Sequence, residues 1–470
     1  MRKWWPLVAI CLGSFVLLLD VTIVNVALPR MARDFGASFS ALQWVVDAYA
    51  LALAAVLLVL GSVADLCGHR RVYLGGLVLF AAASAACAAA PDAAALVASR
   101  AVQGIGGAAM FATATALLTK TYAGRDRGVA FGYWGAVNGA GAAAGPLLGG
   151  LLTQHIGWQA IFLVNVPIVA LTVGLTLRAV APDGRQAAGA GRGGRRLDVP
   201  GAAAFTACAA LLTFALIRGG GHGWTDGAAL GAFGGAAAAL LVFVLVERAS
   251  GDPMLDLGLM RSPSFAGLMA SAVLLQGAAF GPLVLVSMWL QSRSGSGLGL
   301  APVPAGMALL PLSGVSFAVS AVAGRWIQRL PARWAIGVGL LVIAAGLLLM
   351  RHQLVPGAGR SALYAGFAVM GVGVGLATPV LASAAMAAVP PRRIGMAGGA
   401  VNTFRQLGMT LAIAAFTTGL HRVLAVAAGA AALGAVIALV LVRSARRAPG
   451  GVGPRSSVGG TAGADPQRVP

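Results

Sequence analysis

Charged side chains inside otherwise apolar stretches are the residues of this sequence best placed to do chemistry. Asp20 lies in the apolar run 6–28, and Arg100 lies in the run 94–118. An ionisable group in a membrane span costs roughly 2.5–3.5 kcal/mol on insertion scales, so each one is a candidate functional residue. A carboxyl group in such a place can take up and release a proton. Asp20 is therefore a candidate for coupling to a proton gradient.

The two charges are expected at similar depths in their helices. Asp20 lies nine residues before Pro29, roughly 13 Å at 1.5 Å per residue, and Arg100 lies eight residues after Asp92, roughly 12 Å. Two interpretations remain open: a pair governed by protonation of Asp20, and a permanent structural ion pair. A polar position near the outer interface is a further alternative for Asp20. For Asp47, in the second apolar run, an interfacial role and a site role both remain open.

Long apolar helices are needed to hold these side chains, and the composition predicts them. Of the 470 residues, 59% are hydrophobic and 10% are charged, against about 25% charged residues in soluble domains. Each apolar run can cross a ~30 Å hydrocarbon core as a helix, and a helix satisfies its own backbone hydrogen bonds in lipid. The sequence predicts an all-α membrane protein with fourteen spans: 6–28, 42–63, 71–90, 94–118, 129–153, 158–178, 199–217, 228–246, 265–290, 303–323, 333–350, 361–381, 396–419 and 422–442.

The basic residues indicate an orientation. The formal net charge is +20, which in a soluble chain would suggest nucleic acid, but lysine and arginine mark the cytoplasmic loops of membrane proteins. With the N-terminus in the cytoplasm, 24 of the 33 basic residues fall in cytoplasmic segments and 7 in external ones. We therefore expect a multi-pass protein of the cell membrane with both termini in the cytoplasm. The lipid bilayer is its expected partner, and nucleic acid is not.

Two glycine-rich patterns add to the candidate site. The loop after the second span reads Gly61-x-x-x-Asp65-x-x-Gly68-x-Arg70-Arg71; its glycines allow a tight turn, and Asp65 can pair with arginines or cap a helix N-terminus. The fifth span has glycines on one smooth face suited to close helix packing, with a proline that bends the helix. A generic packing face is the alternative interpretation. The residues are Gly135, Gly139, Gly141, Gly145, Pro146, Gly149 and Gly150.

Amide and arginine side chains complete the polar positions inside the spans. Each of them can line a cavity or lock neighbouring helices together, and for Arg405 both roles remain open. The residues are Asn25, Gln103, Asn165, Asn402, Arg405 and Gln406.

Taken in order, these motifs resemble those of the major facilitator superfamily, in its fourteen-helix drug:proton antiporter branch. The first of them is the first-span motif, Leu19-Asp20-x-Thr22-x-x-Asn25-Val26-Ala27-Leu28-Pro29. Several motifs in the expected order make the resemblance more specific than any one of them. The resemblance implies the major-facilitator fold, with two six-helix bundles and two inserted central helices. The expected parts are the bundles 5–178 and 264–445, a cytoplasmic linker 179–198, the inserted helices with their following loop 199–263, and a disordered tail 446–470.

The resemblance also implies roles for the motifs. It associates Asp20 with proton coupling, the Gly61–Arg71 loop with a cytoplasmic gate that holds the outward-open state, and the glycine pattern of the fifth span with antiport. The gate loop departs from the usual pattern at Cys67 and His69, where basic residues are common.

The sequence also lacks several signatures. It contains no Gly-x-x-x-x-Gly-Lys-Ser/Thr run, so we expect no nucleotide as partner. Its four cysteines and five histidines show no metal-ligand spacing, so we expect no metal and no cofactor.

We therefore expect no enzyme but a proton-coupled secondary exporter, an antiporter of an apolar or cationic small molecule such as a drug or an antibiotic-like natural product. The alternatives are an exporter of a specific metabolite and a non-transporting membrane sensor or scaffold.

Overall fold

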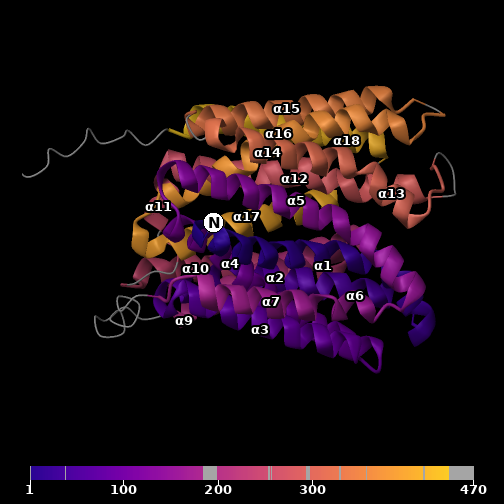
Figure 1. Ribbon diagram of the computed structural model, residues 1–470, viewed down its shortest axis with the longest axis horizontal. Coiled ribbons are helices and arrows are strands. Elements are labelled where there is room, and N and C mark those ends of the chain that lie inside the picture. The colour runs from indigo at the N-terminus through magenta and orange to yellow at the C-terminus, as the bar shows by residue number, and fades with distance from the viewer. Residues whose placement is uncertain are drawn as a thin grey trace, which may run out of the picture.

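The protein is a bundle of helices that lie side by side along one axis (Figure 1). A computed structural model describes residues 2–37, 39–183, 198–251, 255, 257–292, 297–327, 330–355, 357–415 and 419–443. Within these ranges the secondary structure is helical, without strands. This is the arrangement that an apolar chain needs in lipid, because each helix satisfies its own backbone polar groups.

The first bundle occupies the lower part of Figure 1, in indigo to magenta. Its long helices pack mainly in pairs, α1 with α5, α2 with α4 and α3 with α4. Asp92 begins α4 as an N-cap, since its side chain accepts a hydrogen bond of 2.8 Å from the Ala95 amide. The helices are α1 (Trp5–Phe35), α2 (Phe39–Cys67), α3 (His69–Ala88), α4 (Ala93–Thr121), α5 (Gly124–His155), α6 (Ala160–Leu163) and α7 (Asn165–Ala179).

The second bundle occupies the upper part of Figure 1, in orange and yellow. It meets the first bundle along two seams, α5 against α14 and α2 against α17. Its helices are α12 (Pro263–Gln291), α13 (Pro302–Ala308), α14 (Leu310–Ile327), α15 (Ala332–Gln353), α16 (Tyr364–Ala387), α17 (Ile394–Ala415) and α18 (Leu420–Leu441), with the short η2 (Arg360–Leu363) and η3 (Pro391–Arg393).

Two helices lie between the bundles in sequence and cover one of the two seams. Helix α9 (Val199–His222) packs on both α2 and α17, and α10 (Gly227–Ala249) packs on α9. The short α11 (Leu257–Arg261) then leads into α12. The inserted helices therefore lie beside the α2–α17 seam.

Each of the fourteen ranges expected from the sequence overlies helix. The range 158–178 contains the two helices α6 and α7, and 303–323 contains α13 and α14. Eleven helices within the described ranges are long and apolar enough to cross a membrane. Helices α5, α14 and α17 do not meet that criterion, so the number of crossings stays a prediction. Most of the expected linker, 184–197, and the expected tail lie outside the described residues.

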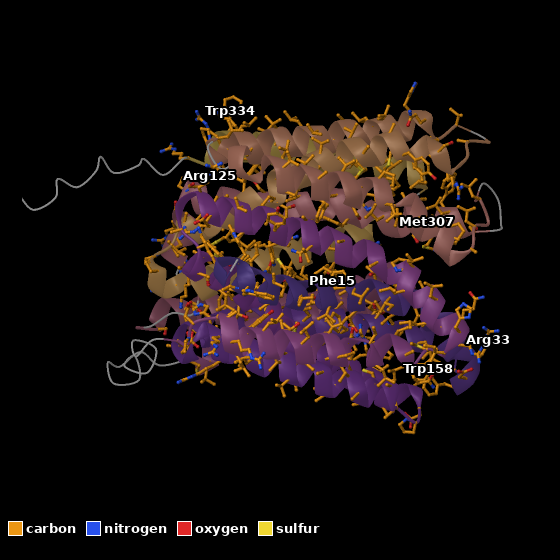
Figure 2. All side chains as sticks on the ribbon, in the orientation of Figure 1. Phe15, Arg33, Arg125, Trp158, Met307 and Trp334 are labelled. Carbon is orange, nitrogen blue, oxygen red and sulfur yellow. The ribbon has the colours of Figure 1, made fainter. Side chains whose placement is uncertain are left out.

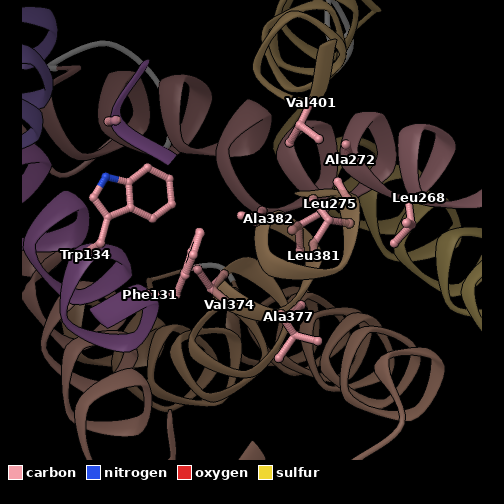
Figure 3. Close-up of a cluster of buried hydrophobic side chains, with 14 of the residues drawn as sticks. Phe131, Trp134, Leu268, Ala272, Leu275, Val374, Ala377, Leu381, Ala382 and Val401 are labelled. Atoms are coloured by element: carbon pink, nitrogen blue, oxygen red, sulfur yellow. The ribbon is translucent and has the colours of Figure 1, made fainter. Parts of the chain in front are cut away.

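The apolar core runs from one bundle into the other. Trp134 and Phe131 of α5 lie in one buried cluster with Val374 of α16 and Leu275 of α12 (Figure 3). Trp134, Phe131 and Leu275 have no exposed surface. Burial of large side chains at this junction holds the bundles together.

The two ends of the molecule correspond to the two sides expected from the charge pattern. Arg125 and Trp334, near segments expected in the cytoplasm, lie at one end in Figure 2. Arg33 and Trp158, from segments expected outside, lie at the opposite end. Residues expected on the same side of the membrane therefore lie at the same end of the molecule. Which end faces the cytoplasm stays a prediction.

Candidate functional site

Asp20 and Arg100 meet in the centre of the first bundle. Arg100 Nη1 lies 2.6 Å from Asp20 Oδ2, and the two residues are 1% and 0% exposed. Helix α1 carries the carboxylate and helix α4 the guanidinium. The two side chains thus lie in one layer, although α1 does not end at Pro29 and continues to Phe35. A charge-assisted hydrogen bond in this dry setting is strong.

Two amide side chains complete the surroundings of the Asp20 carboxylate. Gln103 Nε2 donates to Asp20 Oδ1 at 2.9 Å, and Asn165 Nδ2 donates to the same oxygen at 2.8 Å. Both amide groups also reach the hydroxyl oxygen of Ser84, at 2.8 Å from Gln103 and 3.3 Å from Asn165. We call Asp20, Arg100, Gln103, Asn165 and Ser84 the carboxylate cluster. All five are buried, and they come from α1, α3, α4 and α7.

Arg100 has further partners on α2. Its Nε donates to the Val45 carbonyl oxygen at 3.0 Å, and its guanidinium carbon lies 4.1 Å from the centre of the Tyr49 ring. Its Nη1 also donates to Gln103 Oε1 at 2.6 Å. Asp47 lies between Val45 and Tyr49 in sequence and is half-buried, yet it has no hydrogen bond or ion pair within the described part of the chain. The structure thus leaves Asp47 outside the carboxylate cluster.

At one end of the α2–α17 seam, Asp65 caps α17. Its two carboxylate oxygens accept hydrogen bonds of 2.8 Å each from the amides of Gly395 and Met396, at the start of that helix. A helix N-terminus carries a partial positive charge, so a carboxylate stabilises it. A Cβ at Gly61 would overlap the Gly395 carbonyl oxygen, so only glycine allows this close approach. The sequence left two roles open for Asp65, pairing with arginines and capping a helix N-terminus. In the structure it caps α17.

The two arginines of this motif lie in the first turn of α3, because only Gly68 separates α2 from α3, and they contact the end of α7. Asp183, just past α7, accepts hydrogen bonds from the backbone amides of Arg70 at 3.2 Å and Arg71 at 3.1 Å. The Arg70 side chain donates through Nη2 to the Leu177 carbonyl oxygen at 2.7 Å. Gly68 has φ +103°, a conformation that L side chains rarely adopt, which explains the glycine. The loop is thus held by a second carboxylate that the motif does not contain.

His69, where the loop departs from the usual pattern, lies beside the cap. Its Nε2 is 3.2 Å from Asp65 Oδ1, and its Nδ1 is 2.7 Å from Lys120 Nζ of α4. The ring is 1% exposed. His69 therefore connects the end of α4 with the cap on α17.

The smooth glycine face of α5 packs mainly on α1, inside the first bundle. Cβ atoms at Gly141 and Gly149 would each lie 2.8 Å from a backbone oxygen of α1. A Cβ at Gly145 would overlap the Thr22 hydroxyl oxygen. These three positions therefore require glycine, because the α1 backbone lies directly against them.

The other residues of the glycine pattern are less confined. Cβ atoms at Gly135 and Gly139 would lie 3.7 Å or more from their nearest neighbours, which are atoms of the second bundle. Pro146 reaches α13, where a Cβ at Gly306 would lie 2.8 Å from the proline ring. Helix α5 continues through Pro146 and Gly150 to His155.

Among the remaining candidates, Asn402 and Arg405 join helices and Asn25 does not. Asn402 Nδ2 donates to the Phe111 carbonyl oxygen of α4 at 3.1 Å. Arg405 Nε donates to Gln276 Oε1 of α12 at 3.1 Å. Asn25 is exposed and bonds weakly to its own helix at 3.4 Å, so a helix-locking role for Asn25 is not supported.

Gln406 lies beside these residues on α17 and is half-buried. Its carbonyl oxygen accepts a hydrogen bond of 3.0 Å from the Thr410 hydroxyl within the same helix. Within the described residues, no group of three or more histidine, cysteine, aspartate or glutamate side chains could hold a metal ion.

Sequence reasoning missed several partners in the site. Ser84 interrupts the alanine-rich stretch 81–90, which is a signal for a polar role but not for its partner. Asp183 follows Pro182 in the predicted linker 179–198, and Lys120 lies two residues beyond the predicted span 94–118. Nothing in the sequence connects these residues with Asp20 or with the gate loop. They were found only because the fold brings them together.

Comparisons with known proteins agree with this architecture. The family model described as Major Facilitator Superfamily matches residues 10–413. Over 412 residues, the chain is 36% identical to the Multidrug resistance protein Stp of Mycobacterium tuberculosis, covering 87% of this chain and 74% of that protein. It is 34% identical to the Tetracenomycin C resistance and export protein of Streptomyces glaucescens, covering 88% and 75%.

A solved structure has a similar fold. The human organic anion transporter MFSD10 (TETRAN) aligns with a TM-score of 0.64 over 93% of this chain and 99% of that one. The sequence identity is 17%. The likeness therefore concerns the fold.

Proposed function

The chain belongs to the Major Facilitator Superfamily, and from that premise we propose that it exports a small molecule, a drug or an antibiotic-like natural product, in exchange for protons. Membership makes the chain a multi-pass membrane transporter and not an enzyme. Relatives are named for multidrug resistance and for tetracenomycin C resistance and export. The proton coupling, the direction and the compound are the proposal.

The observation that carries the proposal is the alternative bonding available inside the carboxylate cluster. Each side chain that donates to Asp20 already contacts a second acceptor. Arg100 Nη1 also reaches Gln103 Oε1, and the amides of Gln103 and Asn165 both reach Ser84 Oγ. A proton on Asp20 can therefore remove its charge without leaving these donors unbonded. Buried donors that lose all partners would make such a step costly.

Protonation would change which partners Arg100 prefers. With Asp20 ionised, the two opposite charges attract each other in a low-dielectric interior. With Asp20 neutral, Arg100 keeps the Val45 carbonyl oxygen and the face of the Tyr49 ring, both on α2. Helix α2 also forms the seam with α17. Proton binding at Asp20 is thereby linked to the helix that holds the gate.

The cap of Asp65 on α17 supplies the element that would respond. It fastens the two bundles at one end of the seam through two hydrogen bonds from backbone amides of α17 to the Asp65 carboxylate. We propose that this end faces the cytoplasm and that the cap holds the carrier closed there. A proton entering through a potential of 100 mV contributes ~2.3 kcal/mol, enough to shift a balance between two such states.

The test is transport by the purified chain in proteoliposomes. The probes are tetracenomycin C, because a relative is named for its export, and ethidium as a general multidrug probe. Liposomes with an acidic lumen should accumulate a probe against its gradient. Protons that leave the lumen drive the probe in through those molecules whose cytoplasmic ends face the outer solution. Collapse of the pH gradient with nigericin should stop accumulation. Accumulation that persists without the gradient would contradict antiport.

The same assay separates the alternatives. A specific metabolite exporter would move neither probe, yet would still release protons when its own compound is supplied from a metabolite pool. A sensor or scaffold would move no compound and no protons. The carboxylate cluster favours a carrier over a scaffold, because a scaffold gains nothing from a carboxylate buried in the membrane.

A further inference from the structure

A second buried positive charge lies at the junction of the bundles, outside the carboxylate cluster. Arg405 of α17 is 9% exposed. It lies eleven residues after Ile394, the first residue of the helix, so it is roughly 16 Å along the helix axis. Its Nε donates to Gln276 of α12, and its guanidinium carbon is 5.9 Å from the centre of the Phe111 ring of α4. Arg405 therefore contacts both bundles.

No acidic side chain pairs with Arg405 within the described residues. Arg100, the other arginine deep inside a span, has Asp20 as its counter-ion. Gln276 is a neutral amide, and an aromatic face attracts a cation only weakly. Buried charges in proteins are normally paired. A charge that the fold buries without a counter-ion suggests that a ligand supplies one.

Helix locking does not require this charge. Asn402, one turn before Arg405 on the same face of α17, already joins the bundles by donating to the Phe111 carbonyl oxygen. A neutral amide at position 405 would hold Gln276 equally well and would cost less to bury. The positive charge therefore needs another explanation than the contact between α12 and α17.

We propose that Arg405 recognises an acidic group, a carboxylate or another oxyanion, on the exported compound. The inference rests on the proposed export function and replaces an apolar or cationic compound by an anionic one. Gln276 occupies only Nε. The two Nη groups make no hydrogen bond within the described residues, and together they form the planar fork that binds a carboxylate in a bidentate manner. The Phe111 ring offers the adjoining apolar surface.

The position of the site suits a carrier. Arg405 and Gln276 belong to the second bundle, and Phe111 belongs to the first. A compound held between them would meet a changed environment when the bundles move relative to each other. Binding and release on opposite sides of the membrane require such a difference between states.

The test is equilibrium binding by calorimetry with the full chain in lipid nanodiscs, with empty nanodiscs as the blank. The probes are aromatic carboxylates paired with their neutral carboxamides: naphthalene-2-carboxylate, anthracene-9-carboxylate and pyrene-1-carboxylate. The parent should bind at least one carboxylate about tenfold more tightly than its amide, since a charge-assisted hydrogen bond contributes at least this much.

Three variants locate that preference. Arg405→Gln should lose it while the affinity for the amide stays the same. Arg405→Lys should keep part of it, because an ammonium group has charge but no fork; it also tests the site should the glutamine variant fail to fold. Arg422→Gln, at an exposed position near the start of α18, is the matched control and should bind like the parent.

Two results would overturn the anion site. One is a parent protein that binds no carboxylate more tightly than its amide. The other is an unchanged preference in Arg405→Gln. If the glutamine variant does not fold, an unchanged preference in Arg405→Lys has the same meaning, because lysine lacks the fork that the proposal requires. Because binding is measured without any gradient, a failure of proton-driven export would refute the proposed function and leave the binding result intact.

Discussion

Asp20 Oδ2 and Arg100 Nη1 lie 2.6 Å apart in the interior of the first bundle, although 80 positions separate them in the chain. Neither side chain has more than 1% of its surface exposed. Desolvation of two charges is expensive, and their attraction offsets it only where further hydrogen bonds satisfy the remaining atoms. Gln103, Asn165 and the Val45 carbonyl oxygen supply those bonds. The pair is therefore stable when ionised and sensitive to the loss of either charge.

Asp20→Asn should uncouple transport from the proton gradient. The amide imitates the protonated carboxyl group in shape and charge, so the variant should still exchange a probe down its gradient but lose uphill export. Proteoliposome assays with and without an imposed pH gradient measure both activities. Asp92→Asn is the control, because asparagine is also a good N-cap for α4. Full uphill export by Asp20→Asn would move the proton site elsewhere, with Asp47 the next candidate.

Arg100→Ala should destabilise the protein more than the double change does. The single variant leaves a buried carboxylate without its counter-ion, which costs roughly 3–5 kcal/mol. Adding Asp20→Asn removes that charge and should recover much of the loss. Unfolding midpoints of the four proteins in one detergent give the comparison. If the double variant is as unstable as the sum of the two singles, the two charges are not coupled.

Asp65→Asn should favour opening at the end of the molecule that holds the gate loop. The amide lacks the negative charge that stabilises the N-terminus of α17, and only one of its terminal atoms can accept a hydrogen bond. Spin labels at Arg125 and Trp334, both at that end (Figure 2), report the distance between the bundles by double electron–electron resonance. The distance distribution should shift to longer values, and in Asp92→Asn it should not. An unchanged distribution in Asp65→Asn would mean that the cap does not control the gate.

Gly145→Leu should abolish export while the protein still inserts into the membrane. Even a Cβ at this position overlaps the Thr22 hydroxyl oxygen, so a leucine must push α5 away from α1. Gly174→Leu is the matched control, because a Cβ there meets nothing within 4 Å. Transport and membrane content are measured for both variants. Normal export by Gly145→Leu would show that the close approach of these helices is dispensable.

Cysteine labelling should fix the orientation. In a background without the four native cysteines, a membrane-impermeant maleimide should label Asp92→Cys from outside intact cells. Arg125→Cys should react only after the cells are opened. Both positions are exposed and lie at described helix ends. The reverse pattern would place the gate loop outside the cell and refute the predicted topology.

The sequence predicted the helical architecture and the depth of its charges well. Hydrophobic runs of the required length reveal helices because burial in lipid depends on composition more than on particular neighbours. Counting residues from Pro29 and Asp92 at a fixed rise per residue placed Asp20 and Arg100 in one layer. The two side chains do meet, although α1 continues past Pro29 to Phe35. The motifs also indicated the family, which the match over residues 10–413 supports.

Neighbours across helices were decided by the tertiary structure alone. The glycine face of α5 could have packed on either bundle, and most of it packs on α1. Asp65 had two possible partners, and the fold gives it the start of α17. Ser84 and Asp183 show no signal in the sequence that names their partners. Depth along a helix follows from local geometry, whereas the rotation of a helix and the identity of its neighbour depend on packing between distant segments of the chain.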